Sequence, residues 1–366
     1  MTNKRYRPLL SLETPLLVDE RSRHLWFPTL HLLGEEILCL AAVSADEPQG
    51  VWPVSAYLSR DAGRVWRQVP EIARYALSSV QIGPRETLLL PYELAPLASG
   101  NHRAAIATGT RVSLESSGVI TAVSQEVRFD GFPREVASHP HGGLRMATGS
   151  NVVELADGAL FTTLYGCFEG ERRYSLLGMT SRDSGNSWSF RACLADGKNF
   201  PWVLEGPSEA TTIILPDSKL VCIYRIDSGE GQDYHHSDSV DNGHHWTRPR
   251  PLSGMGSVKP QGIRFADGTL LLTGGRPGLS LWASRHGRAW QTFDLAAHHN
   301  ATIGDHARCF DTDCTSLAIT TSYTALCRLG PQTALVCYDR LGNGWDGAPG
   351  PLGARDAIYC LRLSTI

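Results

Sequence analysis

The chain has 366 residues, of which 42% are hydrophobic, with 34 basic and 37 acidic side chains. The near-balanced charge lacks the basic footprint of a nucleic-acid-binding protein, and no apolar stretch reaches the roughly 18 residues needed to span a bilayer. The basic N-terminal segment has no apolar core behind it and is not a secretory signal, so we expect a cytoplasmic protein.

Six apolar segments are each interrupted by a short turn containing Gly or Asp, and each then resumes as a second apolar segment. Short strands bounded by such turns predict β-hairpins. Successive turns begin 49 to 74 residues apart, which leaves room for two more strands in each unit. The turns lie at 34–36, 83–85, 157–158, 217–218, 267–268 and 330–332.

An eight-residue pattern, Ser-x-Asp-x-Gly-x-x-Trp, occurs three times between these hairpins, at 59–66, 181–188 and 239–246. A shortened version without the Asp lies at 284–290, and the second and sixth units carry none. We interpret the pattern as a turn in which the Asp carboxylate accepts backbone N–H groups, the Gly takes a positive φ and the Trp anchors the turn. These residues build the fold rather than perform chemistry.

Six units of four strands predict an all-β protein, a six-bladed β-propeller with Asp-box-like turns in one domain over residues 1–366. An α/β fold would need helices between the strands, and the sequence shows no convincing amphipathic helix. We expect the last strand, 357–363, to pair with an early one, 9–17, because propellers commonly close their ring in this way.

The chain has nine cysteines, an odd number, which cannot all form disulfides within the chain. We therefore expect buried free thiols rather than a disulfide framework. Cys309 and Cys314 could hold a metal or a disulfide, but no second Cys/His pair of zinc spacing accompanies them, so we expect neither a metal site nor a cofactor. Five cysteines lie in apolar segments and are expected to be buried thiols: Cys39, Cys222, Cys327, Cys337 and Cys360.

The repeats resemble those of the sialidase (neuraminidase) superfamily, whose propellers carry Asp-box (BNR) repeats. Three segments sharpen the resemblance, at 208–225, 260–276 and 321–326, because each is similar to a sialidase element that carries pocket residues. The resemblance implies a hydrolase of the exo-acting glycosidase type. It also implies that Tyr323 is the nucleophile, that Glu209 is its base, and that Arg225 and Arg276 hold the substrate carboxylate.

The chemistry of an acidic keto-sugar explains these residue types. A carboxylate nucleophile would be repelled by the substrate's own carboxylate, whereas a neutral tyrosine is not, provided that a Glu activates it. A separate acid protonates the leaving oxygen, and Asp46 lies where a first-blade loop would supply it, with Glu47 as the competitor. We therefore expect a glycan or small sugar substrate, and no nucleic acid or membrane partner.

One segment departs from the sialidase pattern. Sialidases open their first blade with Arg-Ile-Pro, whose Arg is one of three that hold the carboxylate, and this chain has Trp26-Phe27-Pro28 at that place. One arginine of the clamp is therefore missing, which favours an acidic sugar other than ordinary sialic acid, or a neutral one. Trp26 would then either stack on the sugar or pack in the core.

Other residues keep alternative functions open. Arg145 and Tyr165 flank inner strands of the third unit and are expected to bind substrate, and Glu205 competes with Glu209 as the pocket carboxylate. His24 and His31 keep open a polysaccharide lyase that cleaves a uronic-acid linkage by elimination. A non-catalytic propeller that binds a glycan or a protein is the third alternative, but a binding module does not need both Glu209 and Tyr323.

Overall fold

The computed structural model describes residues 8–46, 52–97, 102–138, 144–227, 232–276, 278–303, 323–342 and 355–366. Strand makes up 56% of the structure and helix 4%, so the prediction of a nearly all-β protein is confirmed. In the described ranges the helices are η1 (Gly197–Asn199), a 3-10 turn, and α1 (Leu295–Thr302). Cys309 and Cys314 lie outside the described residues.

All six predicted turns join two antiparallel strands, as the Gly and Asp positions indicated. The hairpins are β3 (Trp26–Leu33) with β4 (Glu36–Ala42), β7 (Ser78–Gly83) with β8 (Glu86–Leu90), β12 (Met146–Glu154) with β13 (Leu160–Gly166), β16 (Ser208–Ile214) with β17 (Leu220–Arg225), β20 (Val258–Arg264) with β21 (Leu270–Gly275), and β24 (Thr324–Arg328) with β25 (Thr333–Arg340).

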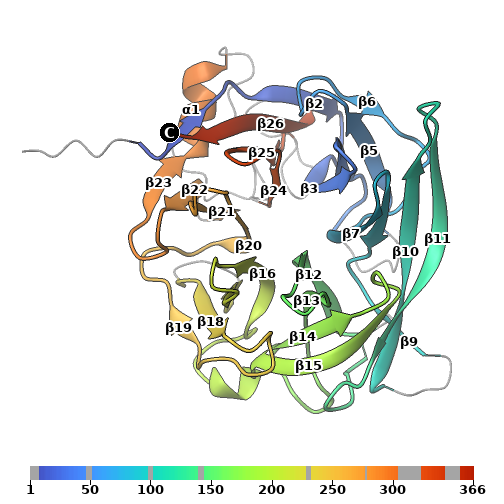
Figure 1. Cartoon of the computed structure of the whole chain (residues 1–366), viewed down its shortest axis with the longest axis vertical. Coiled ribbons are helices and arrows are strands. Elements are labelled where there is room, and N and C mark those ends of the chain that lie inside the picture. The colour runs from blue at the N-terminus through green and yellow to red at the C-terminus, as the bar shows by residue number, and fades with distance from the viewer. Residues whose placement is uncertain are drawn as a thin grey trace, which may run out of the picture.

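The first strands of these hairpins surround a central axis, and we call them the inner strands (Figure 1). In chain order, β3 contacts β7, β7 contacts β12, and the series continues through β16, β20 and β24 back to β3. Side chains at one end of the inner strands therefore converge on the axis, although they are far apart in the sequence.

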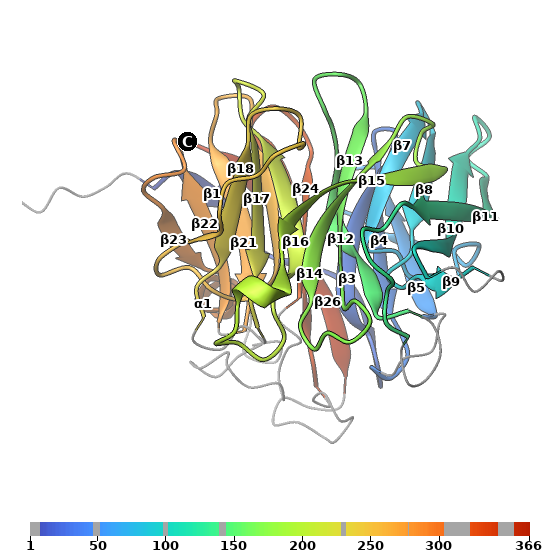
Figure 2. The same cartoon turned by 90° about the horizontal axis from the view of Figure 1, so that it is seen from below.

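Outer strands complete the sheets. Three sheets have four strands and extend the hairpins by β5 (Val54–Ser59) and β6 (Arg67–Gln68), by β18 (His235–Ser239) and β19 (Arg250–Pro251), and by β22 (Leu279–Ser284) and β23 (Gln291–Asp294). A nine-stranded sheet joins two hairpins through β9 (Ala95–Pro96), β10 (Ala104–Leu114), β11 (Ile120–Asp130), β14 (Ser175–Ser181) and β15 (Ser187–Ala195), because β11 and β15 pair in parallel. Figure 2 shows these sheets from the side.

The two ends of the described chain pair in the fifth sheet. The last strand, β26 (Asp356–Thr365), lies on β25 and also pairs with β1 (Leu10–Leu12) and β2 (Leu16–Arg21). The predicted pairing of an early strand with the last one is therefore confirmed, and it protects an edge that would otherwise be open.

The three octapeptide turns share the predicted geometry. In the second turn, Ser181 Oγ donates to Asp183 at 2.7 Å and accepts the Gly185 N–H at 3.0 Å, and Asp183 also accepts the Ser187 N–H at 2.9 Å. Gly185 has φ +86°, which only glycine adopts without strain. The Trp188 ring N–H closes the turn on the Gly185 carbonyl at 3.0 Å. The first and third turns repeat the Ser, Asp and Gly bonds.

The hydrophobic core fills the space between neighbouring sheets. Trp188 of β15 stacks on Phe129 of β11 with ring centres 6.3 Å apart, and Leu38 of β4 packs in one cluster with Leu89 of β8. The five cysteines expected to be buried thiols are buried and free. Within the described ranges, no helix is both long and apolar enough to cross a membrane.

Candidate active site

Three inner strands share an irregularity at the end where the chain enters them. The strand register shifts between Trp26 and Thr29 in β3, and the same shift occurs near the starts of β16 and β20. Phe27, Glu209 and Lys259 lie in these irregular segments with φ of 52°, 47° and 40°. A non-glycine residue at positive φ costs about 1–3 kcal/mol and is typical of functional sites. The bulges aim these three side chains at one cavity on the axis.

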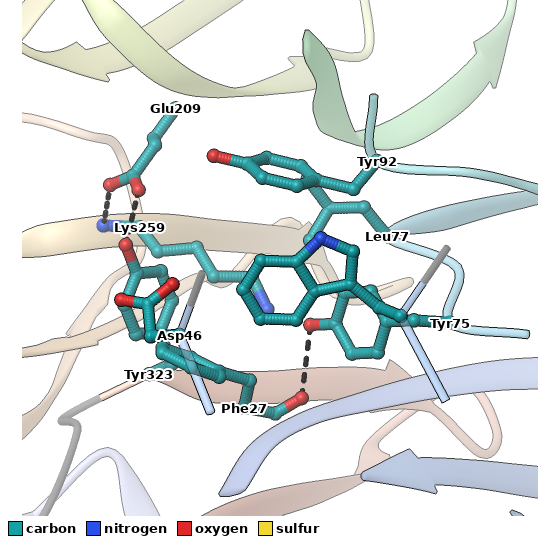
Figure 3. Close-up of a pocket in the computed structure, with 9 residues that line it drawn as sticks. Phe27, Asp46, Tyr75, Leu77, Tyr92, Glu209, Lys259 and Tyr323 are labelled. Atoms are coloured by element: carbon teal, nitrogen blue, oxygen red, sulfur yellow. Dashed lines mark hydrogen bonds between the residues drawn. The ribbon is translucent and has the colours of Figure 1, made fainter. Parts of the chain in front are cut away.

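The cavity has a volume of about 120 Å³. Its size is below the roughly 300–1,000 Å³ of sites that enclose drug-sized ligands. Figure 3 shows the side chains around it. The lining residues are Phe27, Asp46, Trp52, Tyr75, Leu77, Tyr92, Glu209, Lys259 and Tyr323.

Tyr323 and Glu209 form the hydrogen bond that the sequence led us to expect. The Tyr323 hydroxyl donates to Glu209 Oε1 at 2.5 Å (Figure 3). Burial raises the pKa of Tyr323 well above its usual value, and the charge of Glu209 raises it further. The phenol is therefore neutral at rest, and it can act as a nucleophile only if its proton passes to Glu209 during the attack.

Glu209 is held by groups on two neighbouring strands. Its Oε2 atom accepts the backbone N–H of Lys259 at 2.9 Å and lies 2.9 Å from Nε of Arg225. Arg225 extends from the end of β17 and also lies 3.6 Å from Glu205, whose side chain is 40% exposed. The glutamate at the tyrosine is thus Glu209, whereas Glu205 contacts the far side of Arg225.

Lys259 is a buried cation in the wall of this cavity. Its side chain is only 1% exposed, and its Nζ lies 5.5 Å from the centre of the Tyr323 ring. Burial lowers the pKa of Lys259 to about 8, although the charges of Glu209 and Asp339 act to raise it. The ammonium is therefore stabilised by nearby carboxylates but remains costly to bury.

Aromatic rings form the other walls. Phe27 meets Tyr323 edge-on with ring centres 4.9 Å apart, and Trp52 meets both Phe27 and Tyr92 edge-on. The Phe27 backbone is anchored at both polar groups, because its N–H donates to Asp339 at 3.2 Å and its carbonyl accepts the Tyr75 hydroxyl at 2.9 Å. Such faces suit the apolar side of a sugar ring.

Asp46 lines the same cavity from the first sheet's loop. Burial raises its pKa, as do the charges of Glu209 and Glu93, whereas the charge of Arg276 lowers it. A carboxyl group with a raised pKa holds its proton closer to neutral pH, which is the property required of a general acid. The competitor Glu47 lies outside the described residues.

Of the eight residues predicted for the site, Tyr323, Glu209 and Asp46 line the cavity and the other five do not. Trp26 is buried and its ring N–H donates to the Ser44 carbonyl at 2.9 Å, so the core-packing alternative is correct for it. Arg225 lies behind Glu209, and Arg276 acts on Asp46 through its charge.

Tyr165 and Arg145 form a layer behind the wall. The Tyr165 and Tyr92 hydroxyls lie 2.7 Å apart, and the Tyr165 ring meets Tyr174 edge-on. Arg145 in turn lies over the Tyr174 ring, 6.0 Å from its centre. The two residues support Tyr92 rather than line the cavity.

Neither histidine considered for a lyase lines this cavity. His24 packs on Trp26 with ring centres 4.9 Å apart. His31 lines a second cavity of about 540 Å³ further along the inner strands, and burial lowers its pKa to about 3. Both histidines are thus separated from the Tyr323–Glu209 pair.

The sequence analysis did not identify Lys259 or the aromatic residues of the walls. Of these, Lys259 could have been found from the repeat pattern. Glu209 and Lys259 each lie eight residues before the Asp that opens their hairpin turn, so aligning the two repeats would have placed Lys259 in the pocket. Phe27 is next to the residue that was chosen. Trp52, Tyr75 and Tyr92 come from connecting segments without any repeat.

No protein-family model and no curated protein sequence matches this chain. Solved structures do match. A Penicillium chrysogenum α-L-arabinanase complexed with arabinobiose aligns with a TM-score of 0.58 at 15% identity, over 97% of this chain and 98% of that one. Trypanosoma rangeli sialidase aligns with a TM-score of 0.59 at 14% identity, and Hadza microbial sialidase Hz136 with 0.53 at 14%.

The chain has the fold of the sialidase-like propeller glycosidases. The match to the Trypanosoma sialidase includes 97% of this chain but only 60% of the sialidase. The match to the Hadza sialidase includes 94% of this chain and 66% of the sialidase. The arabinanase match, by contrast, is nearly complete for both chains, so the propeller glycosidase fold accounts for almost all of this sequence.

Replacing Lys259 by Met is expected to stabilise the protein at pH 7 by roughly 1–3 kcal/mol, because a buried charge is removed and the apolar stem is kept. The folded-state pKa is about 8 and the ordinary value is 10.5. The penalty is therefore complete below pH 8 and is largely lost by pH 10.5, where the lysine is neutral in the folded state and half deprotonated in the unfolded state.

Urea unfolding of both proteins between pH 7 and pH 10.5 measures this effect. A gain that persists unchanged at pH 10.5 would show that packing, and not charge, is responsible.

Proposed function

We propose that the chain is a glycosidase, a single six-bladed propeller domain in which the six hairpin units are the blades. Tyr323 is the nucleophile, Glu209 its base and Asp46 the general acid. The observation that carries the proposal is the 2.5 Å hydrogen bond between Tyr323 and Glu209 at the cavity on the axis. A purely glycan-binding propeller has no need of an activated phenol.

The reaction takes two steps. In the first, the Tyr323 oxygen bonds to the anomeric carbon while its proton passes to Glu209. The glycosidic bond breaks, and Asp46 protonates the leaving oxygen. In the second, Asp46 removes a proton from a water molecule that attacks the anomeric carbon, the bond between that carbon and the Tyr323 oxygen breaks, and Glu209 returns its proton to the tyrosine oxygen. The sugar is released with retained configuration.

An acidic sugar other than ordinary sialic acid is the substrate class that we propose. A tyrosine nucleophile suits an anomeric carbon that bears a carboxylate, because it avoids repulsion between like charges. Lys259 supplies positive charge in the cavity wall and Arg225 lies behind Glu209, and this chain has Trp26-Phe27-Pro28 where sialidases have Arg-Ile-Pro. A neutral pentose is the second candidate, favoured by the aromatic walls and the match to an arabinanase.

Hydrolysis of a panel of aryl glycosides tests the proposal. The panel contains sialic acid, a shorter keto-sugar acid, a uronic acid and α-L-arabinofuranose, and products are identified by mass spectrometry. We expect the shorter keto-sugar acid to be cleaved at least tenfold faster than sialic acid. Cleavage of arabinofuranoside alone would establish the second candidate. An unsaturated product would establish a lyase, and no cleavage of any member would contradict a glycosidase.

The role of Asp46 has its own control in the same panel. Asp46→Asn is expected to slow the hydrolysis of glycosides with poor leaving groups strongly. It should slow the hydrolysis of nitrophenyl glycosides little, because a good leaving group needs no proton. Equal slowing of both would contradict its role as the acid.

A further inference from the structure

Lys259 faces the first-sheet segment that departs from the sialidase pattern. Its Nζ lies 3.4 Å from the carbonyl oxygen of Pro28, the third residue of Trp26-Phe27-Pro28. The lysine extends from β20, which is separated from β3 by β24 in the ring of inner strands, and its Nζ also lies 5.5 Å from the centre of the Tyr323 ring. A positive charge thus reaches the first-sheet wall from another sheet.

The Lys259 ammonium has more hydrogen-bond donors than acceptors around it. It carries three N–H groups. In the part of the chain that the structure describes, it donates to one acceptor, the Pro28 carbonyl oxygen at 3.4 Å. Glu209 takes the Lys259 backbone N–H, and its carboxylate is also engaged by Tyr323 and Arg225. The ammonium's remaining donors are therefore available to a ligand in the cavity.

Charge and burial define what that ligand is. Lys259 is the one basic residue among the described residues that line the cavity. A buried ammonium with few acceptors is costly, and an anion that enters the cavity would offset that cost with a charge-assisted hydrogen bond. Aromatic rings line the same cavity, and a hydrogen bond is stronger in a site of low dielectric constant than in water.

We propose that the Lys259 ammonium binds the carboxylate of the substrate, and so supplies from β20 the positive charge that the first-sheet segment lacks. This inference rests on the proposed function, because it names the group that selects an acidic sugar. Lys259 is then the specificity-determining residue of the site. It does not enter the bond-breaking step.

The test is calorimetric binding of a free keto-sugar acid and of its methyl ester to the full chain. Both are product-like monosaccharides, so no turnover is needed. Wild type is expected to bind the acid about 10- to 100-fold tighter than the ester, the range of one charge-assisted hydrogen bond. Lys259→Met is expected to bind acid and ester equally, with the ester within about threefold of its wild-type affinity.

Matched variants make the result specific. Lys259→Gln is a second neutral variant in case the Met variant fails to fold. Lys219→Met removes a positive charge that pairs with Asp238 away from the cavity, and it should keep the preference for the acid. Equal binding of acid and ester by wild type, or a preference that survives in both Lys259 variants, would overturn the proposal.

The binding result is independent of the proposed reaction. If the panel shows no hydrolysis but wild type prefers the acid through Lys259, the glycosidase proposal fails and the anion site stands. If hydrolysis occurs but wild type does not prefer the acid, the glycosidase proposal stands and the anion site at Lys259 fails.

Discussion

Tyr323→Phe is expected to lower kcat by about 10³-fold or more on any substrate that the panel identifies, because the variant lacks the attacking oxygen. KM should change little, since the ring and its contact with Phe27 remain. The loss of one donor to Glu209 costs about 1–2 kcal/mol of stability, and Glu209 keeps its bonds to Arg225 and the Lys259 backbone. Steady-state kinetics and thermal unfolding measure the two effects.

Tyr224→Phe is the matched control for this variant. Tyr224 is a buried tyrosine on β17 whose hydroxyl pairs with Ser237 at 2.9 Å, outside the cavity. Its loss should cost comparable stability while activity is retained. A second measurement is a mass shift of one sugar on the Tyr323 peptide after acid quench of a slow substrate. Full activity in Tyr323→Phe would rule out the tyrosine nucleophile.

The hairpins and octapeptide turns were predictable from sequence because their signals are local. A turn such as 157–158 needs a specific φ, and only a few residue types supply it. The Asp183 carboxylate satisfies backbone groups within its own turn, so the pattern carries its geometry wherever it occurs. The pairing of β26 with β1 and β2 was inferred from how propellers close rather than from a local signal.

The site was predictable only where the repeat order brought residues to the axis. Glu209 and Tyr323 are 114 positions apart, yet each is at the start of an inner strand, so a ring of such strands brings them together. The direction of the Trp26 side chain was not predictable, for a different reason. Side chains alternate along a strand, and the irregular register at Trp26 to Thr29 changes which of two neighbours faces the axis.

The aromatic residues of the cavity walls could not be predicted from the sequence. Trp52, Tyr75 and Tyr92 enter the cavity from segments between strands, where no periodicity sets the direction of a side chain. Arg225 and Arg276 were expected to hold a substrate carboxylate, but the charged groups that surround each arginine depend on the three-dimensional structure. Arg225 is paired with Glu209, and a sequence pattern does not show that pairing.

Arg225→Met is expected to cost roughly 3–5 kcal/mol of folding stability, because it leaves the buried Glu209 carboxylate without its ion-pair partner. The Arg225 side chain is 12% exposed and that of Glu209 is 5% exposed, so water replaces little of the lost interaction. Arg225 also holds the Glu209 carboxylate that accepts the Tyr323 proton, so kcat should fall as well.

Urea unfolding and steady-state kinetics at pH 7 measure these two effects. Arg182→Met is the matched control, since Arg182 is a 65% exposed arginine that pairs with Asp157 on an outer turn. Exposed ion pairs contribute about 0–1 kcal/mol, so this control should lose little stability and no activity. If Arg225→Met were as stable as Arg182→Met, the carboxylate would not depend on the guanidinium. If Arg225→Met lost stability but kept full activity, the guanidinium would not be needed to hold Glu209 at Tyr323.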